Sequence, residues 1–250
     1  TLAVGNSFEY SAHSLGLDTL EPDCVQYVVA PSPFDFASQA LLLCADDMPV
    51  PDSPGWEPRL LEALASLLDA SGGRAFVLFT SYKLLKSMAS QIEPYMRQHG
   101  MRLLVQGDKP RKALLDEFRS DIGSVLFGTD SFWEGVDVPG QALSCVIIPR
   151  LPFAVPTAPL LQARVDSVRA RGGDPFRELA LPAAVLKFKQ GFGRLIRTST
   201  DRGAVAVLDP RIVTRRYGRH FIRSLPDCSK AVGPVSELAA ALRDWLCAGT

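Results

Sequence analysis

Seven short runs of apolar residues recur along the chain, and each is continuous rather than alternating with polar residues. They are the segments 25–30, 40–45, 75–80, 102–107, 124–129, 144–149 and 204–209. Continuous runs of valine, isoleucine and leucine are typical of strands that are buried on both faces, which occur mainly in parallel sheets. The runs therefore predict the strands of a mostly parallel sheet.

Helical patterns separate several of these runs. Apolar residues recur every three or four positions over 57–70, 83–99 and 110–120, and Pro110 stands where the last of these helices would begin. Alternation of strands and helices at this rhythm predicts an α/β fold, with a doubly wound, mostly parallel sheet flanked by helices.

The alternation is interrupted at about 150–190. This segment opens with the proline-rich RLPFAVPTAP and continues with an amphipathic stretch that ends at Gly172 and Gly173. It then predicts a helix, a break at Pro182 and a second helix. We expect residues 1–250 to form one domain, with 150–190 as a helical excursion before a last strand at 204–208.

Charge is balanced overall, with 27 basic and 27 acidic residues, but it is unevenly distributed. Residues 1–70 hold eleven acidic residues and one basic residue, whereas residues 187–223 hold ten basic residues and two acidic ones. A basic block in a neutral protein indicates an anionic partner such as a phosphate or a nucleic acid. A solvated basic face explains the block equally well.

Bulk composition excludes several classes of protein. Apolar residues make up 47% of the chain, which is ample for a core, and no uncharged apolar run reaches the roughly 18–20 residues of a membrane span. No export signal opens the chain, so we expect a cytoplasmic protein without membrane contact. The five cysteines and three histidines are scattered, so we expect mostly buried, reduced thiols and no metal site.

Polar residues gather where the predicted strands end, and in an open parallel sheet ligands bind beyond the carboxyl ends of the strands. Thr80 and Ser81 follow one apolar run and stand at the start of a helix, whose N-terminus suits a phosphate. An ordinary helix cap is the more common role of such hydroxyls. Polar residues at 106–108 and 209–211 follow two further runs.

The loop GTDSFWEGVDVPG at 128–140 follows a predicted buried strand. It combines three carboxylates with three glycines, namely Asp130, Glu134 and Asp137 with Gly128, Gly135 and Gly140. Glycines allow the backbone to approach a ligand closely, and packing alone does not require this density of both residue types. We therefore expect a functional loop rather than a plain acidic turn.

The segment QGFGRLIR at 190–197 carries Arg194 and Arg197 three positions apart, behind Gln190. On a helix two such arginines share a face and reach the same phosphate, and arginine stabilises the charge of a transferring phosphoryl group. Gly191 and Gly193 leave room for a close approach. We expect the two guanidinium groups to face the carboxyl edge of the sheet.

Three segments, in this order and at about this separation, resemble the motifs of a helicase. VLFTSYKLL at 77–85, GTDSFWEGVDVPG at 128–140 and QGFGRLIR at 190–197 resemble motifs IV, V and VI of the second motor domain of superfamily 2 DNA helicases of the DinG/XPD group. PSPFDFASQ, IIPRLPF, LDPRI and YGRHFIRSLP add to the resemblance, which covers nearly the whole chain. It implies a RecA-like fold.

The resemblance also implies roles for individual residues. ATP would lie between two RecA-like domains, with Arg194 and Arg197 as arginine fingers and Gln190 as a sensor of the γ-phosphate. Residues near the nucleotide would be Glu134, Asp137, Gly135 and Gly193. Hydroxyls that hold the backbone of single-stranded DNA would be those of Thr80, Ser81, Thr129 and Ser131. Trp133 would stack on a base or serve in the core.

The first motor domain of this group ends in a Ser-Ala-Thr-Leu motif, and the chain begins with Thr-Leu. We expect ATP and Mg²⁺ to be bound mainly by that N-terminal motor domain, which is absent from this chain and is its expected partner. Any iron–sulfur cluster would lie there as well. The phosphate-binding loop GxxxxGK[ST] does not occur in these 250 residues.

The implied function is that of the C-terminal motor domain of an ATP-dependent DNA helicase of repair or replication, with 5′→3′ polarity, inactive as an ATPase alone. It would be cytoplasmic, and associated with the nucleoid in a bacterium. The alternative is a stand-alone nucleic-acid-binding or regulatory module without motor activity. An unrelated α/β phosphotransferase would need a complete nucleotide site within the chain, and no loop offers one.

Overall fold

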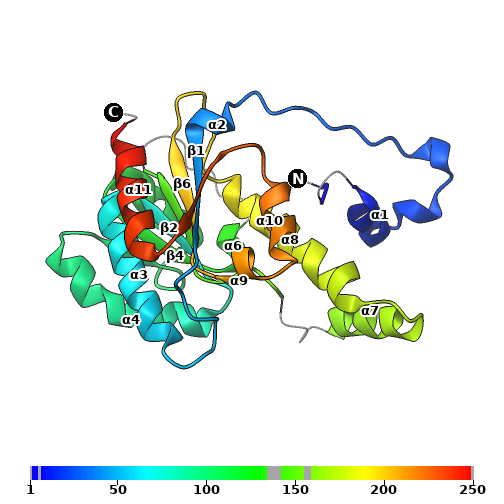
Figure 1. Ribbon diagram of the computed structural model, residues 1–250, viewed down its shortest axis with the longest axis horizontal. Coiled ribbons are helices and arrows are strands. Elements are labelled where there is room, and N and C mark those ends of the chain that lie inside the picture. The colour runs from blue at the N-terminus through cyan, green and yellow to red at the C-terminus, as the bar shows by residue number, and fades with distance from the viewer. Residues whose placement is uncertain (1, 5–6, 134–141, 155–158, 249–250) are drawn as a thin grey trace.

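A seven-stranded parallel sheet forms the centre of the computed structural model, which describes residues 2–4, 7–133, 142–154 and 159–248 (Figure 1). The strands lie in the order β3-β4-β2-β5-β6-β1-β7, and every neighbouring pair is parallel. Their bounds are β1 Ala40–Ala45, β2 Ala75–Leu78, β3 Leu103–Val105, β4 Val125–Gly128, β5 Cys145–Ile148, β6 Gly203–Val207 and β7 Ser229–Gly233. The predicted doubly wound α/β fold is confirmed.

Six of the seven predicted runs form strands, and the run at 25–30 does not. Its residues belong to an N-terminal arm, residues 7–35, which passes outside the sheet, and Val28 and Val29 are 70% and 74% exposed. An apolar run becomes a strand only when a neighbouring backbone supplies hydrogen bonds, and no strand of the described residues pairs with this one.

The edge strand β7 was not predicted. Its sequence SKAVG alternates between more and less exposed positions, because it lies at the edge of the sheet and pairs only with β1. A search for continuous apolar runs selects strands that are buried on both faces and therefore misses an edge strand of this kind.

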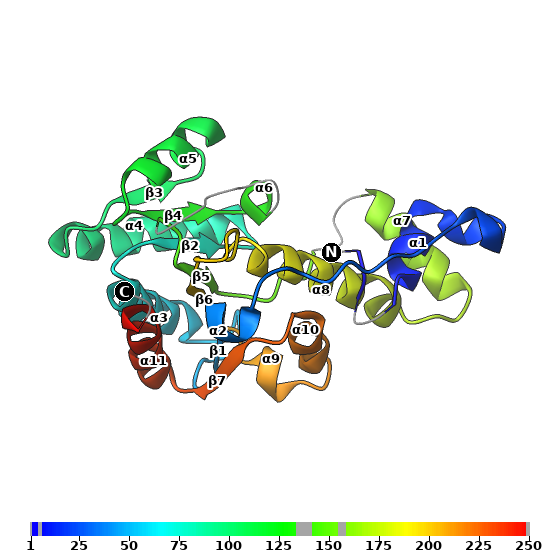
Figure 2. The ribbon, with the colours of Figure 1, turned by 90° about the horizontal axis from the view of Figure 1, so that it is seen from above.

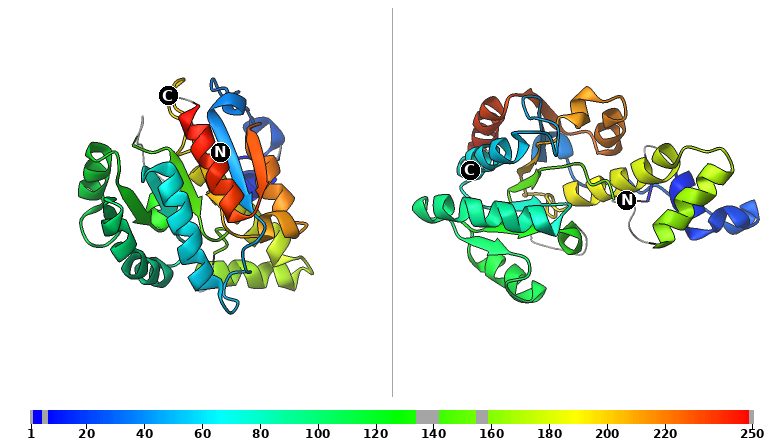
Figure 3. Two further views of the ribbon diagram at one scale, coloured as in Figure 1. Left: turned by 60° about the vertical axis from the view of Figure 1, so that its left-hand side comes forward. Right: turned by 90° about the horizontal axis from the view of Figure 1, so that it is seen from below.

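Helices cover both faces of the sheet. On one face α3 Trp56–Ser71, α4 Tyr82–Gln98 and α11 Val235–Cys247 pack against alternate strand residues such as Leu43. The other face packs against α5 Arg111–Ser120, α8 Leu181–Phe192, α9 Arg211–Thr214 and α10 Gly218–Ser224 (Figure 2). Helices α3 and α11 lie side by side, as the cyan and red ribbons of Figure 3 show. The three predicted helices at 57–70, 83–99 and 110–120 are thus present.

The helical excursion contains α7 Pro159–Ala170 and a π-helical segment, Phe176–Ala180, which continues directly into α8. The predicted break at Pro182 is wrong. Pro182 is the second residue of α8 and follows the π-helical segment directly, so the proline is accommodated without a break in the helix. The chain therefore passes from the excursion into the core layer without interruption, and α7 projects away from the sheet (Figure 1).

Three of the five cysteines, Cys44, Cys145 and Cys228, are buried, whereas Cys24 and Cys247 are exposed. Burial disfavours the thiolate and raises the pKa of Cys44 and of Cys145 to about 12. These two thiols belong to the core, and their raised pKa disfavours the reactive thiolate. Among the described helices, none is both long enough and apolar enough to cross a bilayer.

Candidate functional site

The motif IV and motif V segments meet at the carboxyl ends of β2, β3 and β4. Thr80 follows β2 and is half-buried, and Ser81 caps α4, where its Oγ accepts a hydrogen bond from the Leu84 N–H at 3.4 Å. Thr129 follows β4 and donates both its N–H, at 2.6 Å, and its hydroxyl, at 3.0 Å, to Oε1 of Gln106 at the end of β3. The predicted gathering of polar groups at this edge is confirmed.

One short helix, α6 Asp130–Trp133, follows Thr129. Ser131 is exposed, while Phe132 and Trp133 are buried beneath the sheet. The predicted nucleotide-facing residues Glu134, Gly135 and Asp137 lie in 134–141, outside the described residues.

The motif VI segment lies at the end of α8, and its arginines are not on a helical face. The helix ends at Phe192 with Gly193 as its C-cap, so Arg194 lies in a turn and Arg197 in irregular backbone. Gln190 occupies the last turn of α8 and is half-buried, as are both arginines. The predicted i, i+3 pair on one helix is therefore wrong, because the helix stops before either arginine.

The expectation that the two guanidinium groups face the carboxyl edge of the sheet stays a prediction, although the backbone that follows Arg197 turns toward the amino edge. The residues after Arg197 lead to the amino end of β6, and they are bonded to Gln39, which precedes the amino end of β1.

Motif VI is nevertheless joined to motif V by a direct contact. The Arg194 Nε donates a hydrogen bond to the carbonyl oxygen of Trp133 at 3.2 Å. The hydroxyl groups at the carboxyl edge and the guanidinium group at the end of α8 thus belong to one connected structure, with α6 between them.

Hydrogen bonds from Gln39 and to Asp201 hold the loop that carries Arg197. Oδ2 of Asp201 accepts the backbone N–H groups of Arg197 and Thr198, both at 2.8 Å. The buried amide of Gln39 donates to the carbonyl oxygens of Thr198, at 3.0 Å, and of Asp201, at 2.8 Å. Sequence patterns did not indicate Gln39 or Asp201, and the only signal was the place of Gln39 at the end of PSPFDFASQ.

We predict that Gln39→Ala lowers the free energy of unfolding by about 1–3 kcal/mol, because two carbonyl groups lose their buried donor. Urea denaturation of the chain measures this change. The matched control is Gln98→Ala at the exposed end of α4, for which we expect a change within about 0.5 kcal/mol. Equal effects of the two substitutions would contradict a holding role for Gln39.

The carboxyl end of β6 carries a buried ion pair. Asp209 is fully buried and accepts a hydrogen bond from the Leu151 N–H at 2.9 Å. It also accepts Nε and Nη2 of Arg211 at 2.8 and 2.6 Å, and the hydrogen bond to Asp209 raises the pKa of Arg211. Asp209 thereby ties Leu151, near the start of the excursion, to the end of β6, and the pair is structural.

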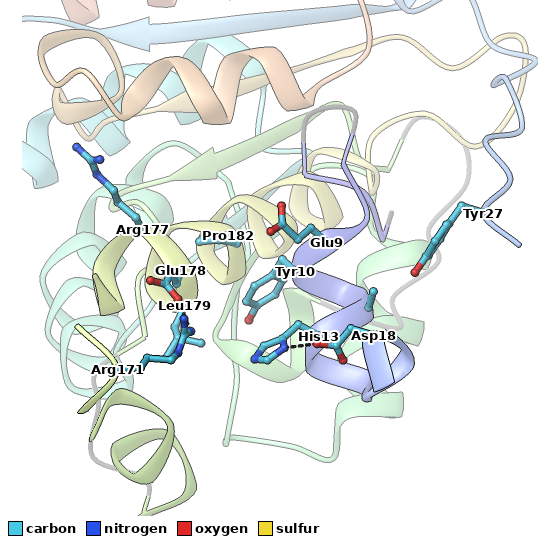
Figure 4. A pocket seen from close by; sticks show the side chains of 11 residues that line it. Glu9, Tyr10, His13, Asp18, Tyr27, Arg171, Arg177, Glu178, Leu179 and Pro182 are labelled. Carbon is cyan, nitrogen blue, oxygen red and sulfur yellow. Dashed lines mark hydrogen bonds and ion pairs between the residues drawn. The ribbon is translucent and has the colours of Figure 1, made fainter. Parts of the chain in front are cut away.

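A cavity of about 730 Å³ lies apart from the motif segments, between the N-terminal arm and the π-helical segment (Figure 4). Its lining includes Tyr10, His13, Arg171 and Arg177. The charges are largely compensated within the cavity, since Arg171 pairs with Glu178 and His13 Nδ1 lies 2.6 Å from Asp18. In the described residues no cluster of His, Cys, Asp or Glu side chains is arranged to hold a metal ion.

The basic block divides between the site and a separate surface. Arg194 and Arg197 belong to motif VI, whereas four exposed arginines lie on α10 and in the turn before it, namely Arg215, Arg216, Arg219 and Arg223. These four arginines form a positively charged surface. Such a surface is consistent with nucleic-acid binding and equally with a solvated basic face.

Known helicases are similar to this chain in sequence. The family model described as the helicase C-terminal domain matches residues 64–228. The chain is 42% identical over 230 residues to the ATP-dependent DNA helicase YoaA of Haemophilus influenzae, covering 92% of this chain and 35% of that protein. It is 40% identical over 245 residues to the ATP-dependent helicase DinG of Mycobacterium tuberculosis, covering 97% of this chain and 36% of that protein.

Among solved structures, the apo form of XPD superposes with a TM-score of 0.61 at 18% identity, over 78% of this chain and 40% of that one. This likeness shows the shared RecA-like fold. The chain spans little more than a third of the length of the curated relatives named above. With a family model over most of its length and two relatives at 40% identity or more, the chain belongs to the helicase C-terminal domain family, as a C-terminal motor domain of the DinG/XPD group.

Proposed function

We propose that this chain is the second motor domain of an ATP-dependent DNA helicase and works only when it is joined to a first motor domain. The observation that carries the proposal is the connection between motif V and motif VI through Arg194 and Trp133. A domain that responds to both a nucleotide and a nucleic acid needs such a connection between its two binding regions.

Arg194 and Arg197 would act as arginine fingers, and Gln190 would sense the γ-phosphate. Two guanidinium groups and a carboxamide suit a phosphate group, but they do not make a complete nucleotide site. ATP and Mg²⁺ would therefore be held mainly by the first motor domain, whose phosphates face this chain. Glu134 and Asp137, with Gly135 and Gly193 beside them, would couple that nucleotide to the DNA.

Single-stranded DNA would lie across the carboxyl ends of β2, β3 and β4. Thr80 and Ser131 would donate their hydroxyl groups to phosphates, and so would Ser81, because its capping bond uses only an acceptor lone pair. Thr129 donates its hydroxyl to Gln106, and this bond orients the Gln106 carboxamide so that its Nε2 group becomes the donor. Contacts of this kind hold the backbone without reading sequence.

Closure of the two motor domains around ATP and reopening after hydrolysis would move the strand. The proposal includes 5′→3′ polarity, a role in DNA repair or replication, and association with the nucleoid in a bacterium. An iron–sulfur cluster, where one is present, belongs to the first motor domain.

The test compares ATP hydrolysis by this chain alone with hydrolysis by a polypeptide in which a first motor domain precedes it. We expect DNA-stimulated turnover only from the two-domain protein, and weak, salt-sensitive binding of single-stranded DNA by the chain alone. Helicase-like turnover by the chain alone would overturn the proposed division of labour. Absence of turnover from both proteins, with DNA binding retained, would favour a stand-alone binding module.

A further inference from the structure

Trp133 is the point at which the three motif segments meet. Its side chain is fully buried, and its ring N–H donates a hydrogen bond to the carbonyl oxygen of Phe79, directly after β2, at 3.2 Å. The motif V residue Trp133 is thereby fixed to the end of the motif IV strand. Full burial also excludes stacking of this ring on a DNA base.

The same ring packs against α8 over one helical turn. The Nζ of Lys187 lies 5.5 Å from the ring centroid, and Gly191 follows one turn later. A Cβ atom at Gly191 would lie 2.9 Å from Cζ3 and 3.0 Å from Cε3 of the ring. The contact between α6 and α8 is therefore closed to any side chain at position 191.

The backbone of Trp133 completes the connection, because its carbonyl oxygen accepts the Arg194 Nε. The indole ring of Trp133 thus fixes the position of α8. The carbonyl group of the same residue fixes the orientation of the Arg194 side chain, which follows α8. Both contacts with motif VI come from Trp133, and the hydrogen bond to Phe79 fixes Trp133 to the end of β2.

We propose that Trp133 is a positioning residue that aligns Arg194 for its action on the γ-phosphate. The inference rests on the proposed function, in which Arg194 is an arginine finger, and adds the element that aligns it.

The first test is Gly191→Ala in the two-domain protein. The new methyl group forces α8 away from the indole ring, and we expect kcat for DNA-stimulated ATP hydrolysis to fall about 10²-fold, as for a misplaced catalytic group. KM for ATP and the affinity for single-stranded DNA without nucleotide should change less than about twofold, since neither depends on the aligned arginine. Gly123→Ala is the matched control, because a Cβ there meets no atom within 4 Å.

A second substitution keeps the test decisive if Gly191→Ala does not fold. Trp133→Phe removes the hydrogen bond to Phe79 and the outer ring, yet leaves an aromatic side chain in the core, and kcat should again fall while KM is retained. The phenylalanine ring is smaller and makes room for the methyl group at position 191. In the double variant with both substitutions, kcat should therefore fall by less than the product of the two single fold-losses.

The background Arg194→Ala separates alignment from general damage. If Trp133 acts through Arg194, Trp133→Phe should have no further effect on the residual single-turnover rate in that background. A further loss there, or unchanged kcat in both folded single variants, would overturn the proposal. Absence of turnover from the unmodified two-domain protein would instead overturn the proposed function, so the two failures are distinguishable.

Discussion

Arg194→Ala or Arg197→Ala, introduced into the two-domain protein, is expected to lower kcat for ATP hydrolysis by about 10³- to 10⁵-fold, the usual contribution of an arginine finger. The reason is that charge builds on the phosphoryl group in the transition state, and a guanidinium group from the opposite domain neutralises it. Steady-state ATPase assays with saturating single-stranded DNA measure the loss.

Binding of single-stranded DNA in the absence of nucleotide should largely survive both substitutions. The DNA contacts that we propose are hydroxyl and carboxamide groups at the carboxyl ends of β2, β3 and β4, and neither arginine belongs to that set. Fluorescence anisotropy with a labelled oligonucleotide, at a stated salt concentration, separates the two functions.

Arg243→Ala is the matched control, because Arg243 is exposed on α11, which covers the opposite face of the sheet from α8. This variant should keep the turnover of the unmodified protein. Retained turnover in both Arg194→Ala and Arg197→Ala would refute the finger assignment, and loss in only one would identify the single finger.

The second large effect concerns stability. Asp209→Ala should lower the free energy of unfolding by about 3–5 kcal/mol, because it removes one partner of a buried ion pair and leaves the other charge without compensation. Asp209 is fully buried and Arg211 is 24% exposed, so little solvent reaches the guanidinium group in its place. The Leu151 N–H loses its acceptor in the same variant. Urea denaturation of the chain gives the value.

Asp227→Ala is the control for charge alone. Asp227 is 99% exposed and lies 3.9 Å from Lys230, so its removal should change stability by no more than about 0.5 kcal/mol. Asp209→Asn should fall between the two, since an amide oxygen still accepts the Leu151 N–H. A loss below about 1 kcal/mol for Asp209→Ala would show that solvent or a rearranged side chain replaces the carboxylate.

The interior strands and the principal helices could be predicted from the sequence because their signals are local. The run ALLLCA is buried on both faces as β1, and the three-and-four periodicity of 57–70 becomes α3. The run at 25–30 carries the same local signal without a partner strand, and β7 has a partner strand without that signal. Pairing between strands depends on residues far apart in the sequence. It explains why β7 is a strand and the run at 25–30 is not.

The candidate site was likewise predicted from the sequence only in part. The spacing of residues 128–140 and 190–197 identified the motif segments, and the hydroxyl groups at the ends of β2 and β4 lie where an open parallel sheet places them. Motif VI could not be placed in space, because that depends on where α8 ends and on the direction in which it crosses the sheet. The two hydrogen bonds of Gln39 reach carbonyl groups that lie 159 and 162 positions further along the chain, and no spacing rule reveals such contacts.

By itself, then, the order of residues determined the fold class, through patterns within a few turns or strand lengths. It identified the family and the motif residues through their resemblance to known motifs. Only the tertiary structure decided that Trp133 is a buried link rather than a base-stacking surface, and that the Arg194 side chain is bonded to the Trp133 carbonyl group. The physical reason is that burial and alignment arise from contacts between α6, α8 and β2, which the chain brings together only when the sheet is complete.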